Sequence, residues 1–144
     1  MRAQASIEYM YYYIILLIFI SIVIYGLFSY YQIQVQENNR YNLYLLEQYI
    51  RSVFVSASRL GPGGYVELDL PSIVNFDSYQ INLIRDNTDH TSARIYLNLN
   101  RSNYTYSFNV QTEYVFAQEN FNFSSGKKYI IRITYNNETM IEER

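Results

Sequence analysis

The chain begins with a long stretch in which almost every position is apolar. No residue from 9 to 36 carries a charge, and most side chains from 10 to 28 are aliphatic or aromatic. About 20 such residues form a helix of about 30 Å, which is enough to span the hydrocarbon core of a bilayer. Residues 26–31 contain no small-x-small cleavage site of the kind that ends a secretory signal peptide. We therefore expect this helix to remain on the mature protein.

A second helical pattern follows a polar interval at residues 32–40. Its apolar positions are spaced by three and four residues and form one amphipathic stripe: Leu43, Leu46, Ile50, Val53, Ala57 and Leu60. The stripe is expected to pack on the C-terminal domain, and an intermolecular coiled coil is the alternative. Asn38 and Asn39 have low helix propensity and predict a bend or a melted turn. Residues 61–64, Gly-Pro-Gly-Gly, are predicted to end the helix.

Beyond residue 64 the apolar period changes to two, which predicts short strands at residues 65–70, 79–85, 93–99, 104–110, 114–117 and 129–135. Turn-forming residues separate them at 86–90, 100–103 and 124–127. The predicted fold class is α+β, with a long N-terminal hydrophobic helix packed on a C-terminal antiparallel β-sheet or sandwich. Its expected core is Val66, Leu68, Leu70, Ile81, Leu83, Ile95, Leu97, Leu99, Tyr106, Phe108, Ile131 and Ile133.

Composition removes several classes of function. The 144 residues carry a formal charge of -2, and the Lys and Arg residues are scattered, which excludes nucleic acid as a partner. There is no cysteine for a disulfide or a thiol site, and His90 is the single histidine. Asp86, Asp89 and His90 match no calcium-loop spacing and are expected to form a solvated hairpin tip. Because no catalytic motif is present, we expect neither an enzyme nor a bound cofactor or metal.

Four Asn-x-Ser/Thr sequons lie in the predicted β-domain, at Asn100, Asn103, Asn122 and Asn137. We expect at least one of them to carry a glycan, and plain turn chemistry is the alternative. Four tyrosines near the start of the apolar run are expected to form an interfacial aromatic belt and to pack normally after assembly: Tyr9, Tyr11, Tyr12 and Tyr13.

Glu8 is an acid that directly precedes the uncharged segment. A carboxylate there costs several kcal/mol in hydrocarbon unless a cation neutralises it. Arg2 is one candidate within the chain. If residues 1–3 are removed, a new α-amine appears at Gln4, one helical turn away, and the amine of a neighbouring subunit can meet Glu8. The alternative is a solvated acid favoured by the helix dipole.

The segment Gln4-Ala5-Ser6-Ile7-Glu8 ahead of a hydrophobic helix resembles the Q-x-S-x-E class III signal peptide of archaeal type IV pilin-like proteins. Residues 60–64 and 66–71 are similar to the junction between helix and β-domain in this group. The resemblance implies that a prepilin peptidase cuts between Ala3 and Gln4. It makes Glu8 the fifth mature residue, whose carboxylate pairs with a neighbour's amino terminus, and places Gln4, Ser6 and Glu8 in the assembly region.

The domain organisation expected on this basis has four parts: a leader at 1–3, a helix at 4–60 (4–31 membrane or filament core, 32–60 amphipathic), a junction at 61–64 and an extracellular β-domain at 65–144. The implied function is that of a structural subunit of an archaeal surface pilus serving adhesion. The implied partners are copies of the chain, the peptidase, an assembly ATPase, its membrane platform protein and, before assembly, the cytoplasmic membrane. The alternatives are a signal-anchored monomeric binding module and a minor pilin or archaellum accessory subunit.

Overall fold

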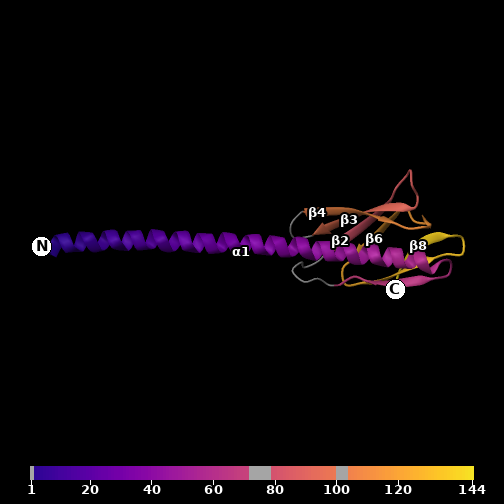
Figure 1. Ribbon diagram of the computed structural model, residues 1–144, viewed down its shortest axis with the longest axis horizontal. Coiled ribbons are helices and arrows are strands. Elements are labelled where there is room, and N and C mark those ends of the chain that lie inside the picture. Colours follow the sequence, from indigo (N-terminus) through magenta and orange to yellow (C-terminus); the bar gives the residue numbers. More distant parts are fainter. Residues whose placement is uncertain (1, 72–78, 100–103) are drawn as a thin grey trace. The chain divides into compact units, whose positions relative to one another are not determined.

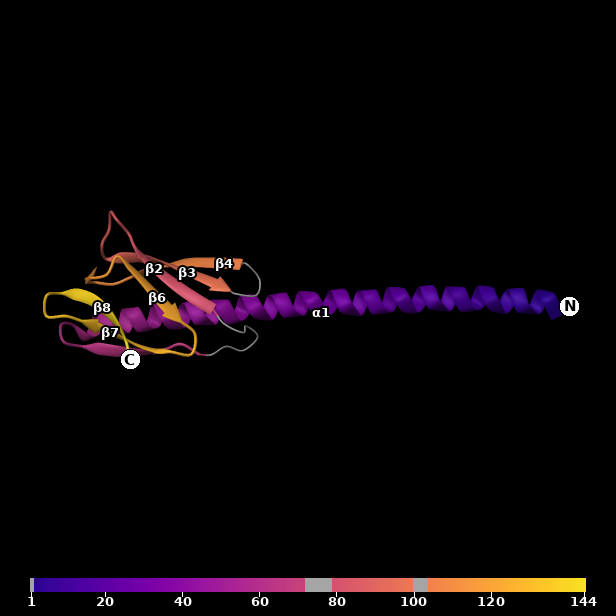
Figure 2. The same ribbon diagram turned by 180° about the vertical axis from the view of Figure 1, so that it is seen from behind.

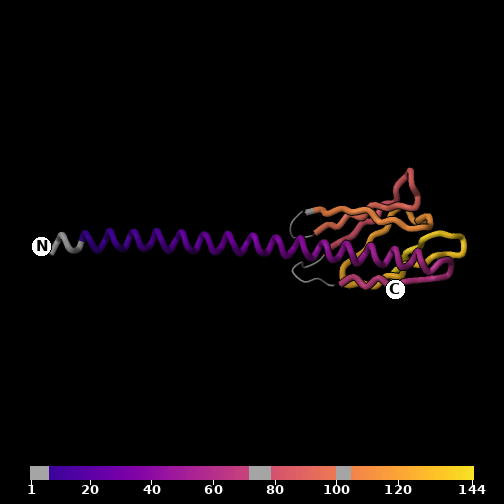
Figure 3. Tube along the Cα trace, in the orientation of Figure 1, coloured from indigo at the N-terminus to yellow at the C-terminus, as the bar shows by residue number. Residues whose placement is uncertain are grey.

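The computed structural model describes residues 2–71, 79–99 and 104–144, with side chains from residue 7 onward except that of residue 104. The chain divides into two compact units, Met1–Leu43 and Tyr44–Arg144. Helix α1, Arg2–Leu60, makes up the described part of the first unit and continues into the second (Figures 1 and 3). All eight strands of the described chain belong to the second unit.

The polar interval of α1 is helical throughout, so the melted turn expected at Asn38 and Asn39 is wrong. The reason is the cooperativity of helix formation. An asparagine in a helix costs only about 0.7 kcal/mol relative to alanine. Opening a turn and starting a second helix would repeat the unfavourable nucleation step.

The second unit contains two four-stranded sheets, which confirms the predicted α+β class. The first sheet has the order β1-β7-β8-β5, and β5 runs parallel to β8 while the other pairs are antiparallel: β1 Tyr65–Asp69, β7 Lys128–Ile133, β8 Glu138–Glu143 and β5 Val115–Phe116. The second sheet has the order β4-β3-β2-β6 and is antiparallel throughout: β4 Tyr104–Gln111, β3 Ser92–Leu99, β2 Tyr79–Arg85 and β6 Asn120–Ser124.

Within this unit, residues 44–60 of α1 run beside the strands (Figures 1 and 2), and their side chains contact both sheets. The Phe54 ring packs on Phe116 of β5, with ring centroids 5.8 Å apart. On the other sheet, the guanidinium of Arg51 lies over the ring of Phe108 in β4. The helix therefore fills the space between the sheets and supplies apolar side chains to a core that the β-strands alone would leave thin.

Most of the helix stripe and of the predicted core is confirmed, and three positions are wrong, one in the stripe and two in the core. Leu60 is 57% exposed, because α1 ends at this residue and the chain turns away. Val66 and Tyr106 are half-buried. The pattern missed Phe54, which is fully buried between stripe positions.

The Gly-Pro junction ends the helix as predicted. Gly61 and Gly63 have φ values of 71° and 85°, a left-handed conformation that favours glycine. The Gly63 amide then donates to the Ile133 carbonyl oxygen at 2.8 Å. This bond ties the junction to the end of β7.

Candidate functional site

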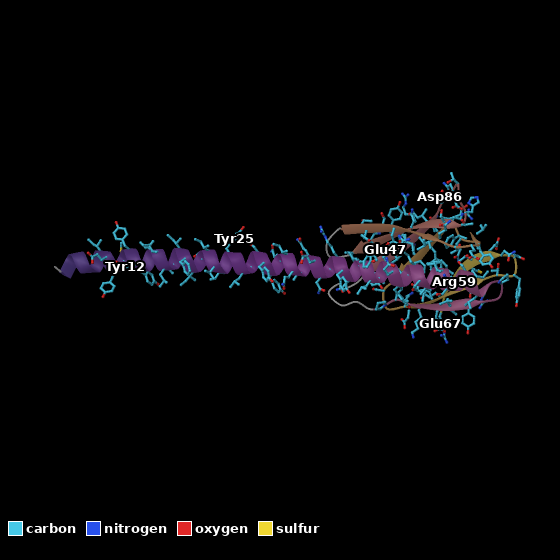
Figure 4. All side chains as sticks on the ribbon, in the orientation of Figure 1. Tyr12, Tyr25, Glu47, Arg59, Glu67 and Asp86 are labelled. Atoms are coloured by element: carbon cyan, nitrogen blue, oxygen red, sulfur yellow. The ribbon has the colours of Figure 1, made fainter. Side chains whose placement is uncertain are left out.

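The most distinctive surface of the molecule is the apolar part of α1. Twenty-three large hydrophobic side chains between Ile7 and Val35 are exposed, at fractions from 38% to 78%. They surround the helix on all sides, as the side chains around Tyr12 and Tyr25 illustrate (Figure 4). Among the described residues, α1 is the one helix long and apolar enough to cross a membrane, by length and composition.

Water is a poor environment for this segment. Burying one large apolar side chain yields about 1.5–3 kcal/mol. Leaving the whole segment in water therefore costs on the order of tens of kcal/mol. A helix that is hydrophobic on every side belongs in lipid or among other apolar helices. The surface is thus a candidate for membrane anchoring or for helix–helix assembly.

Two polar side chains of the exposed part of α1 have local partners. The Ser21 hydroxyl donates to the Leu17 carbonyl oxygen at 2.8 Å. Further along, the Gln34 side-chain amide donates to the Tyr30 hydroxyl at 2.7 Å. Bonds of this i to i−4 type satisfy polar groups without water, so they suit a segment surrounded by lipid or protein.

Glu8 lies within α1 and its side chain is exposed. The processing and assembly positions Ala3, Gln4 and Ser6 are helical, and their side chains lie outside the described set. Positions 4 and 8 of a helix are about one turn apart on the same side, whereas positions 2 and 8 point in directions about 120° apart around the axis. The helical backbone therefore disfavours Arg2 as the internal partner of Glu8. A cation from outside the chain is the better candidate.

In the loop with Asp86, Asp89 and His90, both aspartates accept hydrogen bonds from residues of the loop itself. Asp86 Oδ1 accepts hydrogen bonds from the Thr88 amide and hydroxyl at 2.9 and 2.7 Å. Asp89 Oδ1 accepts in the same way from the hydroxyl and amide of Thr91 at 2.5 and 3.0 Å. No three His, Asp or Glu side chains of the described chain come together as a metal site. The loop is the solvated hairpin tip that the sequence predicts.

We expect both loop acids to titrate below the ordinary value of 3.8. The Thr88 backbone hydrogen bond, and then its hydroxyl, lower the pKa of Asp86. The Thr91 hydroxyl, and then its amide, lower the pKa of Asp89. A lowered folded-state pKa means that these bonds favour the fold above the unfolded-state pKa, and that this contribution is lost as the pH falls through the folded-state pKa. Carbon-detected NMR of the side-chain carboxyls measures both values.

Replacing Thr91 by valine tests whether the threonine hydroxyl lowers the pKa of Asp89. It removes the hydroxyl donor to Asp89 and leaves Thr88 in place, so the pKa of Asp89 should rise while that of Asp86 stays low. Carboxyls that titrate at or above 3.8 in the unmodified protein would contradict the assignment.

One buried acid was not anticipated by the sequence. Glu47 on α1 is 8% exposed, pairs with Arg51 Nε at 2.8 Å and accepts a hydrogen bond from the Tyr106 hydroxyl of β4. The i,i+4 spacing of Glu47 and Arg51 was its only signal in the sequence. Its partners on the helix and on β4 give it a structural role, orienting the helix against the second sheet.

Two of the four sequons lie within the described residues. Asn122 is exposed on β6, and Asn137 is exposed in the turn before β8 with a φ of 61°. Their hydroxyl residues differ, because Ser124 is half-exposed whereas Thr139 is fully buried. The sequon at Asn122 is therefore the more accessible of the two in the folded chain. Asn100 and Asn103 lie outside the described residues.

The outer face of the first sheet carries several ion pairs. Lys128 Nζ lies 3.2 Å from Asp69 Oδ2, and Arg132 pairs with Glu142 at 3.8 Å. Arg144 pairs with Glu67 on the edge strand β1. Because these side chains are about half exposed, each pair contributes at most about 1 kcal/mol. This face is a solvated surface.

No protein-family model, curated protein or solved structure matches this chain significantly, so its function rests on the surfaces described above.

Proposed function

We propose that this protein is a structural subunit of an archaeal type IV-like surface pilus. The observation that carries the proposal is the segment Gln4-Ala5-Ser6-Ile7-Glu8 at the start of a helix whose apolar side chains are exposed on every side. A folded, polar unit with two sheets follows that helix in the same chain. Such a chain can be held in a membrane by one end and present the other to the outside.

In the proposed mechanism the subunit is made as a membrane-held precursor. A prepilin peptidase removes residues 1–3, and an assembly ATPase acting through a membrane platform protein adds the subunit to a growing homopolymer. Neighbouring helices then replace lipid around the apolar segment. The contacts are heterologous and do not close into a ring, which is the symmetry that produces filaments. The β-bearing units lie on the outside and serve adhesion.

In this scheme Glu8 sets the axial offset between neighbouring subunits. Its carboxylate meets the α-amine of Gln4 on a neighbouring subunit, displaced by about one helical turn. A charge pair inside an apolar bundle is costly unless both partners are present. Subunits offset by any other distance leave both groups unpaired.

The second candidate is a monomeric, signal-anchored binding module whose helix stays in the membrane, and a minor pilin or archaellum accessory subunit lies between the two. The exposed apolar helix favours both, since lipid and neighbouring helices satisfy it equally. The two differ in whether residues 1–3 are removed and in where the chain is found.

Mass spectrometry of the amino terminus tests the proposal. Filaments sheared from native cells are compared with the membrane fraction of the same cells. An abundant sheared form that begins at Gln4 is the expected result. A form that retains Met1 and stays in the membrane fraction would overturn the pilus subunit and leave the anchored module.

A further inference from the structure

The outer face of the second sheet is chemically unlike that of the first. Three rows of outward-facing residues cross β6, β2, β3 and β4 and are set by the strand register. In that strand order the rows are Ser124, Gln80, Asn98 and Thr105; Asn122, Asn82, Tyr96 and Ser107; and Asn120, Ile84, Arg94 and Asn109. All of them are exposed or half-exposed, and they alternate along each strand with the buried core.

The three rows contain no Asp or Glu and one cation, Arg94. Amide and hydroxyl groups dominate, and each offers both donors and acceptors of hydrogen bonds. A plain solvated sheet face usually carries charges of both signs, as the first sheet does with its Lys, Arg, Asp and Glu pairs. The second face is instead matched to a partner that is polar and uncharged.

A hollow of about 210 Å³ lies at one end of this face. It is lined by Tyr96 and Ile84, by three residues with planar hydrogen-bonding groups, Asp86, Arg94 and Asn109, and by Arg85, Ser92 and Ala93. Figure 4 shows Asp86 on the side of the unit opposite Glu67 of the first sheet. The hollow is smaller than the 300–1,000 Å³ typical of drug-sized ligands, and its size suits one small ring.

The polar groups of the hollow are already oriented. Arg94 Nε donates to Asn109 Oδ1 at 3.3 Å, which holds the guanidinium and the amide side by side. Asp86 uses one oxygen, Oδ1, for both bonds to Thr88, which fixes the plane of its carboxylate. Preorganised groups of this kind lose little conformational entropy when a ligand binds.

We propose that this hollow binds one hexose unit of a neutral polysaccharide. A hexose has an apolar face of C–H groups, which packs on an aromatic ring such as Tyr96, and a rim of vicinal hydroxyls. Those hydroxyls donate to Asp86 and Asn109 and accept from Arg94. The amide and hydroxyl rows beyond the hollow extend the contact to further sugar units along the same chain.

Charge decides among the possible occupants. Arg85 and Arg94 line the hollow together with one acid, Asp86. Because Arg85 is already paired with Glu119 at 3.2 Å, Asp86 balances Arg94, and a polyanion such as a uronic acid polymer or a nucleic acid gains no net attraction. The face has one aliphatic side chain, Ile84, and lacks the apolar centre of a protein–protein interface. The proposal concerns the second unit alone and holds whether α1 polymerises or remains in a membrane.

The test uses the full chain in detergent micelles. Methyl α-glucoside, methyl α-mannoside and methyl α-galactoside are titrated by saturation-transfer-difference NMR, and mannan, dextran and alginate are immobilised as affinity matrices. We expect at least one neutral glycoside to bind with a dissociation constant of about 1 mM, and its neutral polymer to retain the protein, since several weak contacts add up along a chain. Alginate should not retain it.

Variants locate the site. Tyr96→Ala and Arg94→Ala should each weaken binding at least about tenfold. Tyr96→Phe, which keeps the ring, should retain it, and this result also separates loss of binding from loss of fold. Tyr65→Ala, which removes an exposed tyrosine from β1 of the first sheet, is the matched control and should bind normally. Absence of neutral-sugar binding, equal retention by alginate, or an unaffected Tyr96→Ala variant would each overturn the proposal.

Discussion

Replacing Glu8 by alanine is expected to abolish filament formation while residues 1–3 are still removed. The substitution leaves the α-amine of Gln4 on the neighbouring subunit without its partner inside an apolar bundle. An unpaired charge in such an environment costs about 3–5 kcal/mol. Because each 1.4 kcal/mol is a factor of ten, filament yield should fall at least about a hundredfold. Electron microscopy and quantitation of sheared filaments measure the loss, and the mass of the amino terminus measures processing.

Glu37→Ala is the matched control for this experiment. Glu37 is the first acid after the apolar segment and is also exposed on α1. It should assemble normally, because it lies outside the apolar part of the helix. If Glu8→Ala yielded as many filaments as the unmodified protein, the carboxylate would have no role in register. A chain that acts as a lone anchor should instead insert at least as well without Glu8, since an acid near the membrane is a cost.

Phe54→Ala is expected to destabilise the second unit by about 3–5 kcal/mol. The Phe54 side chain is fully buried, and its ring contacts Phe116 of β5. Truncation leaves a cavity between the helix and the first sheet that its neighbours fill only in part. Since single domains are stable by about 5–15 kcal/mol, this is a large fraction of the whole. Denaturant unfolding of the full chain in detergent, followed by near-ultraviolet circular dichroism of the tyrosines, measures the change.

Leu60→Ala tests a position at which the sequence pattern and the structure disagree about burial. The apolar spacing places Leu60 in the buried stripe, whereas the side chain is 57% exposed at the end of α1. A surface substitution usually changes stability by no more than about 0.5 kcal/mol. The other five stripe positions are buried, so the two faces differ only at this end of the helix. A loss at Leu60 as large as the loss at Phe54 would mean that Leu60 is also packed on the sheets.

The strands show where local pattern suffices and where it fails. β2, β3 and β7 each have apolar residues at alternate positions facing a core, and they were predicted close to their observed bounds. β8 was missed because only Thr139 and Ile141 of its six residues are buried. It is nevertheless paired on both sides, with β7 and β5, so its extended backbone is determined by its neighbours.

β6 was missed for a different reason. Phe121 and Phe123 do alternate with asparagines, which is a strand pattern, but asparagine has a low strand propensity and the following Ser-Ser-Gly reads as a turn. Packing overrides the propensity. The Phe123 ring lies 4.9 Å from the ring of Tyr129 on β7, and this contact joins the two sheets directly. The two residues are only six positions apart, but they lie on strands of different sheets, and the local pattern does not indicate that division.

By itself, the sequence determined the features that depend on neighbouring residues. These are the membrane-length helix, whose uncharged run has only lipid or other apolar helices as a favourable environment, and the glycine junction that ends it. Only the tertiary structure decided that Phe54 and not Leu60 completes the buried face of the helix, how eight strands divide into two sheets, and that Tyr96, Asp86 and Asn109 line one hollow. Those outcomes arise from contacts between residues far apart in the chain, where total packing and strand register prevail over local preference.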